Sequence, residues 1–212
     1  MYLPTPFAES RPEVLRALMR EHPLATLLTQ GADGLSADHV PLELDPRPAP
    51  LGTLVGHVAR ANPMWRTLGQ GAAALAVFHG PAAYVSPAWY PSKREHGKVV
   101  PTWNYVVVHA AGTLRAIEDP VWLQALVERL TVRHEAGRPA PWQVADAPPD
   151  FVAAMRRGIV GLELRLERLQ GKWKLSQNRP AADVAGVIAA LEASDDPDAR
   201  AVAARMRAAR DG

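Results

Sequence analysis

The sequence predicts a mainly antiparallel β barrel with inserted and flanking α-helices, an α+β arrangement. Six or seven segments have the apolar or alternating pattern of strands, and turn residues separate most of them. No βαβ alternation runs through the middle of the chain, which disfavours a doubly wound parallel sheet. At 212 residues the chain is long enough to bury a large core. We therefore predict a barrel domain over residues 1–180 and a C-terminal helical extension over residues 181–212 that packs on the barrel.

The first half of the chain supplies a helix and four predicted strands. Ser10 and Glu13 match the capping-box pattern and begin a helix that ends near His22. The other predicted elements are a hairpin with strands at 25–30 and 35–44 around a turn at 31–34, a proline-rich loop at 45–50, and strands at 52–57 and 73–78.

The second half continues with a long strand at 103–117, which alternates enough to bury one face. Leucines at 162, 164 and 166 alternate with charged residues, which predicts a half-buried strand. The other predicted elements are helices at 119–133, 150–157 and 184–191, a last helix after Asp196-Pro197, and a proline-rich loop at 138–149.

Residues 78–105 are the most distinctive part of the sequence, because they hold two tryptophans and three tyrosines. Such side chains need hydrogen-bond partners when they are buried, so this stretch is poor core material. Four prolines, at 81, 87, 91 and 101, prevent a continuous helix. We interpret the stretch as a loop-rich wall of a ligand site.

The first candidate site combines Arg60 with the helix start Asn62-Pro63. A guanidinium beside free backbone N–H groups suits a phosphate. The alternative is an ordinary capped helix with a surface arginine. His57 either joins this site or simply ends the preceding strand.

Two further clusters of polar residues are candidates. Lys98, Trp103 and Asn104 together suit a flat anionic or heteroaromatic ligand, although Trp103 could instead fill the core from a strand edge. Residues 176–180 place polar side chains between a strand and a helix, where Asn178 or Arg179 could serve as the cap.

Several classes of function are disfavoured. The chain has no cysteine, which excludes thiol catalysis and Cys-ligated metals, and its seven histidines are scattered singly without an HExxH motif. No GxSxG, GxGxxG or P-loop motif occurs. The net charge of +2 and the arginines of the C-terminal tail, interleaved with acids, favour a solvated helix face over a nucleic-acid surface. Without a signal peptide or an apolar run of membrane-spanning length, we expect a soluble cytoplasmic protein that does not bind membranes.

Six motifs in register resemble the PaiB-type proteins, described as FMN-binding negative transcriptional regulators: MYLPTPF, DHVPL, GHVARANPMW, FHGPAAYVSPAWY, VPTWNYVVVHAAG and GKWKLSQNR. The resemblance covers residues 1 to about 191 and implies an FMN-binding split barrel, with flavin bound in the groove of a homodimer. It also implies a set of groove residues: His39, Gly56, His57, Arg60, Asn62, Trp65, Trp103 and Asn104. The second cluster of polar residues adds Lys98 to this set.

The resemblance leaves the class of function open. A flavin-dependent oxidoreductase, or a haem-binding split-barrel protein with a histidine as axial ligand, is the alternative to a regulator. Binding to DNA is implied by the resemblance alone, since the sequence shows no helix-turn-helix with a basic recognition helix.

Overall fold

The computed structural model describes residues 1–31, 34–45 and 51–211, which form strands and helices in the following order. The strands are β1 (Ala8–Glu9), β2 (Leu24–Gly31), β3 (Gly34–Pro41), β4 (Glu43–Asp45), β5 (Thr53–Ala59), β6 (Ala72–Val85), β7 (Thr102–Ile117) and β8 (Ile159–Lys174). The helices are α1 (Pro12–Glu21), α2 (Ser92–His96), α3 (Pro120–Glu135), α4 (Pro149–Arg157), α5 (Ala181–Glu192) and α6 (Pro197–Asp211). Short 3₁₀ turns are η1 (Thr5–Phe7), η2 (Pro63–Thr67), η3 (Pro87–Trp89) and η4 (Val144–Asp146).

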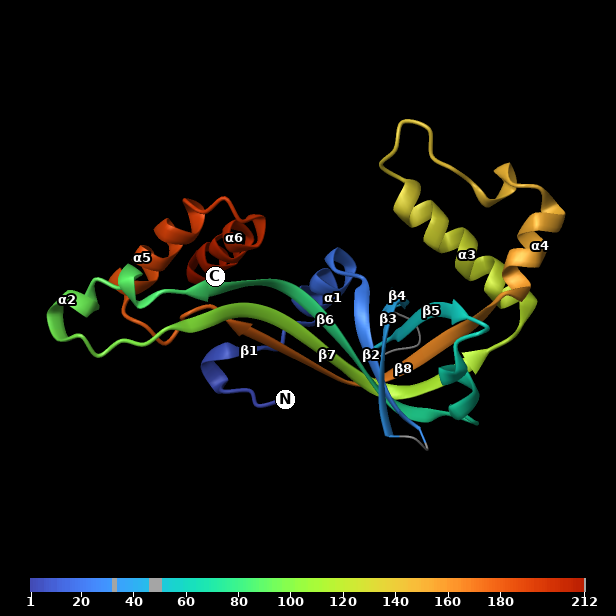
Figure 1. Cartoon of the computed structure of the whole chain (residues 1–212), viewed down its shortest axis with the longest axis horizontal. Coiled ribbons are helices and arrows are strands. Elements are labelled where there is room, and N and C mark those ends of the chain that lie inside the picture. Colours follow the sequence, from blue (N-terminus) through green and yellow to red (C-terminus); the bar gives the residue numbers. More distant parts are fainter. Residues whose placement is uncertain (32–33, 46–50, 212) are drawn as a thin grey trace. The chain divides into compact units, whose positions relative to one another are not determined.

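The described chain divides into two compact units, each made of segments that are separate in the sequence. Unit 1 comprises Met1–Leu18, His79–Val108 and Gln170–Gly212, and unit 2 comprises Met19–Phe78 and His109–Leu169. The strands follow the order β3-β2-β6-β7-β8-β5-β4, with β1 paired to β8, and the three long strands β6, β7 and β8 contribute residues to both units (Figure 1). The predicted boundary near residue 180 stays a prediction.

Unit 2 contains a barrel. Strand pairs β2–β3, β2–β6, β4–β5 and β5–β8 are antiparallel. Strand β3, at one end of the strand order, approaches β5 near the other end at Gly56, where an added Cβ would lie 2.6 Å from the Pro41 carbonyl oxygen and 2.9 Å from a Leu42 methyl group. Leucines fill the interior, among them Leu27, Leu42, Leu54, Leu114, Leu162 and Leu164. The barrel that the sequence predicts is therefore confirmed.

In unit 1 the helices α5 and α6 pack on each other (Figure 1). Their contact buries Val187, Ile188 and Leu191 of one helix and Val202 and Met206 of the other. Apolar residues at helical spacing form this contact between the two helices, as the sequence pattern predicts. At the start of α5, the Asp183 carboxylate accepts hydrogen bonds from the Ser92 hydroxyl (2.7 Å) and its backbone N–H (3.1 Å).

Most predicted elements are present within one to three residues of the expected ends. The hairpin is confirmed, because Gly31 pairs with Gly34 across a two-residue connection. Residues 32–33 of its turn and residues 46–50 of the proline-rich loop lie outside the described residues. The strand expected at 35–44 is interrupted at Leu42. The Leu42 N–H still donates to the Pro23 carbonyl (2.8 Å) at the next position of the β2–β3 register, but Pro23 has no N–H to return the bond.

Two local predictions are wrong. Residues 78–85 are not loop but the second half of β6. Pro81, Ala83 and Val85 are buried in alternation, and this strand pattern was obscured by the proline. Neither Asn178 nor Arg179 caps α5, since the N-cap is Pro180 and no side chain caps the helix.

Candidate functional site

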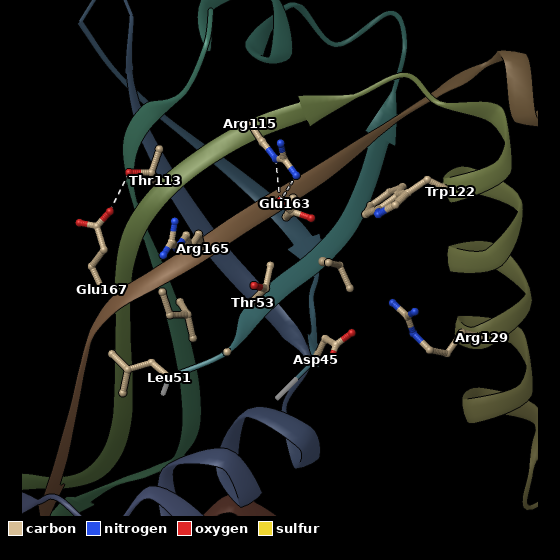
Figure 2. Close-up of a pocket in the computed structure, with 13 residues that line it drawn as sticks. Asp45, Leu51, Thr53, Thr113, Arg115, Trp122, Arg129, Glu163, Arg165 and Glu167 are labelled. Carbon is tan, nitrogen blue, oxygen red and sulfur yellow. Dashed lines mark hydrogen bonds and ion pairs between the residues drawn. The ribbon is translucent and has the colours of Figure 1, made fainter. Parts of the chain in front are cut away.

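A large cavity with a volume of about 840 Å³ lies in unit 2. Strands β5, β7 and β8 form its floor and helix α3 one wall (Figure 2). Its lining comprises Asp45, Leu51, Gly52, Thr53, Val55, Thr113, Arg115, Trp122, Arg129, Glu163, Arg165, Leu166 and Glu167. Cavities of this size are typical of small-molecule sites.

The alternation of β8 places charged side chains on this floor. Leu162, Leu164 and Leu166 are buried, while the residues between them belong to the opposite face of the strand. In the register with β5, Arg165 pairs with the buried Thr53 and Glu163 pairs with Val55. The charged residues of this alternating pattern therefore line the cavity.

Ion pairs occupy most of the charged groups. Arg115 contacts the Glu163 carboxylate at 2.6 Å, and the Thr113 hydroxyl donates to Glu167 at 2.7 Å. Arg129 on α3 is paired with Glu43 at 2.8 Å. Within the described ranges, no hydrogen bond or ion pair engages the Arg165 guanidinium, which Figure 2 shows between the other two pairs. Arg165 is therefore the cation available to a ligand.

Trp122 supplies an aromatic ring to the wall of the cavity. Asp119 caps α3, accepting hydrogen bonds from the backbone N–H groups of Val121 (2.7 Å) and Trp122 (3.1 Å). The indole then lies against Gly161 of β8, where an added Cβ would collide with the ring. The cap and the glycine together fix the position of the ring.

This donor set fits a flat ligand that carries a phosphate. A guanidinium without a partner, next to a second arginine, can bind phosphate oxygens with charge-assisted hydrogen bonds. The Trp122 indole offers an apolar surface to a planar ring, and the Thr53 hydroxyl is a further hydrogen-bonding group on the floor.

The structure brings two of the predicted groove residues, Arg60 and Trp65, together elsewhere in unit 2. The Arg60 guanidinium donates to the carbonyls of Arg157 (2.8 Å) and Ile159 (3.2 Å) and pairs with Glu118 at 2.6 Å. Trp65 donates from Nε1 to the Arg60 carbonyl (3.1 Å), and its ring lies 5.7 Å from the guanidinium. All three nitrogens of Arg60 therefore bind the chain itself, so a phosphate there would have to replace these bonds.

Asn62 is the N-cap of η2, as its sequence pattern predicts. Its side chain accepts from the Met64 N–H (2.9 Å) and donates to Asp38 (2.7 Å). The element that it caps is a five-residue 3₁₀ turn rather than an α-helix. His39 follows Asp38 on β3 and is exposed.

The adjacent predicted residues Gly56 and His57 lie on opposite faces of β5. Gly56 is buried where β5 approaches β3 and has a packing role. His57 lines a second, smaller cavity, and its Nδ1 is buried without a hydrogen-bond partner among the described residues. Burial lowers the pKa of His57 below its usual value, which favours the neutral imidazole.

The remaining predicted residues belong to unit 1 and have separate environments. Asn104 is fully buried and donates to the Ser176 hydroxyl at 3.0 Å. Trp103 is 55% exposed, so it does not fill the core, and it makes an edge-on contact with Tyr84. Lys98 is exposed. Whether any of the predicted residues touches a cofactor stays a prediction.

Sequence reasoning missed the residues of the large cavity. Thr113, Arg115, Glu163, Arg165 and Glu167 occupy alternate positions of two strands, a pattern equally typical of a solvent-exposed sheet face. Only the pairing of β7 and β8 and the position of α3 turn this face into a cavity. Trp122 carried no distinguishing signal, because tryptophans at helical spacing usually belong to the core.

Two features are absent from the described residues. No helix there is long and apolar enough to cross a membrane. The same residues contain no group of three or more His, Cys, Asp or Glu side chains that could hold a metal ion.

Comparisons with known proteins agree with this fold. The family described as "Putative FMN-binding domain" matches residues 1–168. The Bacillus subtilis protein named "Protease synthase and sporulation protein PAI 2" is 33% identical over 97% of this chain and 96% of its own length. An uncharacterized protein of Aspergillus fumigatus is 34% identical, covering 91% of each chain.

Among solved structures, the FAD and heme binding protein from Mycobacterium smegmatis superposes with a TM-score of 0.59 at 19% identity, covering 84% of this chain and 78% of the other. This likeness shows the fold and confirms the split barrel.

Proposed function

Since this chain belongs to the "Putative FMN-binding domain" family, we propose that it binds FMN in the large cavity of unit 2. The Arg165 guanidinium holds the phosphate beside the Arg115–Glu163 ion pair, and the Trp122 indole packs against the ring system. Bound FMN would supply a redox-active ring that accepts one or two electrons. The chain's own residues bind and orient that ring, and the floor of strands together with the α3 wall restricts its contact with water.

The observation that carries this proposal is the free guanidinium of Arg165. The carboxylates on either side of it along β8 would repel a phosphate if they were free. Glu163 is instead paired with Arg115, and Glu167 accepts a hydrogen bond from Thr113. The negative charge of these two carboxylates is therefore partly offset, and the Arg165 guanidinium can bind the ligand.

The proposal extends to the role of the protein: a homodimeric, flavin-binding negative regulator of transcription. The resemblance of the six motifs to the PaiB-type proteins supports this role, and the similarity to the Bacillus subtilis protein extends over nearly the full length of both chains. The groove residues implied by the resemblance, such as His39 on the exposed face of β3, are then available to the second protomer.

Flavin fluorescence tests the binding step. FMN is titrated with the purified protein, and the account expects quenching or a polarisation increase with a dissociation constant below about 100 μM, or roughly −5.5 kcal/mol. Absence of binding by both the purified and the refolded apo-protein would overturn the proposal.

Turnover separates a regulator from an oxidoreductase. The flavin-loaded protein is mixed with NADH or NADPH, and absorbance at 340 nm is followed. The proposed regulator shows no turnover above that of free FMN, whereas sustained oxidation of the nucleotide would favour the reductase.

A further inference from the structure

A second cavity in unit 2, of about 230 Å³, lies between β5, α3, η4 and α4. It is lined by His57, Gln124, Val127, Trp142, Val144, Ala147, Phe151, Val152, Met155, Arg156 and Ile159. Aliphatic and aromatic side chains dominate this list, and the rings of Trp142 and Phe151 are each about half exposed. Such a partly open carbon surface on a folded domain marks a binding site.

None of the described residues that line this cavity is a carboxylate. The charged side chain of the lining is Arg156, which donates from Nη1 to the Gln124 side-chain oxygen at 2.8 Å. Burial lowers the pKa of His57, which favours its neutral form. A cationic ligand would therefore find no counter-charge there and would lose its hydration.

The size of the cavity limits the ligand. A carbon-lined cavity of about 150 Å³ in another protein stays dry and binds benzene. The larger volume here, about 230 Å³, has room for two fused rings. Trp142 and Phe151 offer stacking or edge contacts, and the Met155 sulfur is a favourable neighbour for an aromatic ring.

The small cavity shares two structural elements with the large one. On β5, Thr53 and Val55 line the large cavity and His57 lines the small cavity. On α3, Trp122 and Arg129 belong to the first, whereas Gln124 and Val127 belong to the second. A ligand in one cavity therefore packs against the strand and helix that form the other.

From these observations we propose that the small cavity binds an uncharged bicyclic aromatic molecule of the indole class. The ligand is enclosed by the carbon side chains of α3, η4 and α4. This site is separate from the flavin site and does not depend on flavin being bound.

Calorimetric titration with indole tests the proposal. The wild-type protein is expected to bind one indole per chain with a dissociation constant below about 1 mM. Tryptamine, which carries a positive charge on the same ring system, should bind at least tenfold more weakly. Equal affinity for the two compounds, or no binding of indole at 5 mM, would overturn the proposal.

A matched pair of substitutions locates the site. Ala147→Trp places a ring in the small cavity, whereas Ala145, two residues away and exposed, lies outside its lining. Ala147→Trp should abolish indole binding and Ala145→Trp should preserve it. If Ala147→Trp does not fold, Phe151→Ala replaces it, because the exposed Phe151 contributes a wall but little core, and at least a fivefold loss is expected.

A second copy of the chain is the competing occupant. Size-exclusion chromatography with light scattering of Phe151→Asp distinguishes it from a small ligand. The proposal expects an unchanged oligomeric state in this variant. Conversion of a dimer into monomers, together with absent indole binding by the wild type, would show that the surface is an interface between protomers.

Discussion

The main-chain carbonyl of Arg165 lies directly against Gly112 of β7, at a position where a Cβ would overlap it. This close approach brings together the two strands that form part of the floor of the large cavity. The next residue, Thr113, then reaches Glu167, and Arg115 reaches Glu163. The glycine thus sets the spacing on which the arrangement around Arg165 depends.

Gly112→Ala should destabilise the protein and weaken FMN binding. The added methyl group meets backbone atoms of β8, which cannot move aside without separating the strands. We expect a loss of about 1–3 kcal/mol in the free energy of unfolding, measured by urea denaturation. Gly137→Ala is the control, since nothing lies within 4 Å of its added Cβ. Equal stability of the two variants would contradict the close strand contact.

Asn104→Ala should destabilise unit 1 without affecting the flavin site. The buried amide donates to the Ser176 hydroxyl (3.0 Å) and to the Met206 sulfur (3.4 Å), and its loss removes this partner from both groups. We expect the free energy of unfolding to fall by about 1–3 kcal/mol. The affinity for FMN should be unchanged. The exposed Asn178→Ala serves as control. An affinity loss in a folded Asn104→Ala protein would support the groove role that the resemblance implies for Asn104.

His57 should make stability depend on pH in the acidic range. Its pKa is lowered in the folded protein, so the unfolded chain binds more protons between the lowered pKa and the ordinary value of about 6.5. The free energy of unfolding therefore rises as pH increases through this window and falls on acidification. Urea denaturation at pH 5 and pH 7.5 should show a smaller pH difference for His57→Gln than for the wild type. Identical differences would show that His57 is not desolvated.

Direct binding to DNA should be weak and independent of sequence. The basic residues of α6 are largely engaged: Arg207 pairs with Glu192, and Arg200 donates to the Ser194 carbonyl at 2.7 Å. In a mobility-shift assay at about 150 mM salt, the protein should retard promoter and scrambled DNA equally, because phosphate contacts alone carry no sequence information. Tight promoter-specific retention that is lost on deletion of residues 195–212 would contradict this expectation.

The sequence predicted the fold better than the site, for a physical reason. Period-two alternation at Leu162–Leu166 and the cap at Asp119 are local signals, and both elements form as predicted. The large cavity depends on non-local pairing, since Thr53 meets Arg165 only through the β5–β8 register. Arg60 shows the opposite limitation: its position beside a turn suggested a phosphate site, but distant carbonyls at 157 and 159 occupy its guanidinium.

Comparison of Arg165→Gln with Arg60→Gln in the FMN titration tests the central claim most directly. Loss of a charge-assisted phosphate contact should cost about 1.5–3 kcal/mol, so Arg165→Gln should weaken FMN binding roughly 10- to 150-fold. Arg60→Gln should mainly lower stability, because that side chain binds Glu118 and two backbone carbonyls. Unchanged affinity in Arg165→Gln, with a tenfold or greater loss in a folded Arg60→Gln protein, would contradict the account and move the phosphate to Arg60.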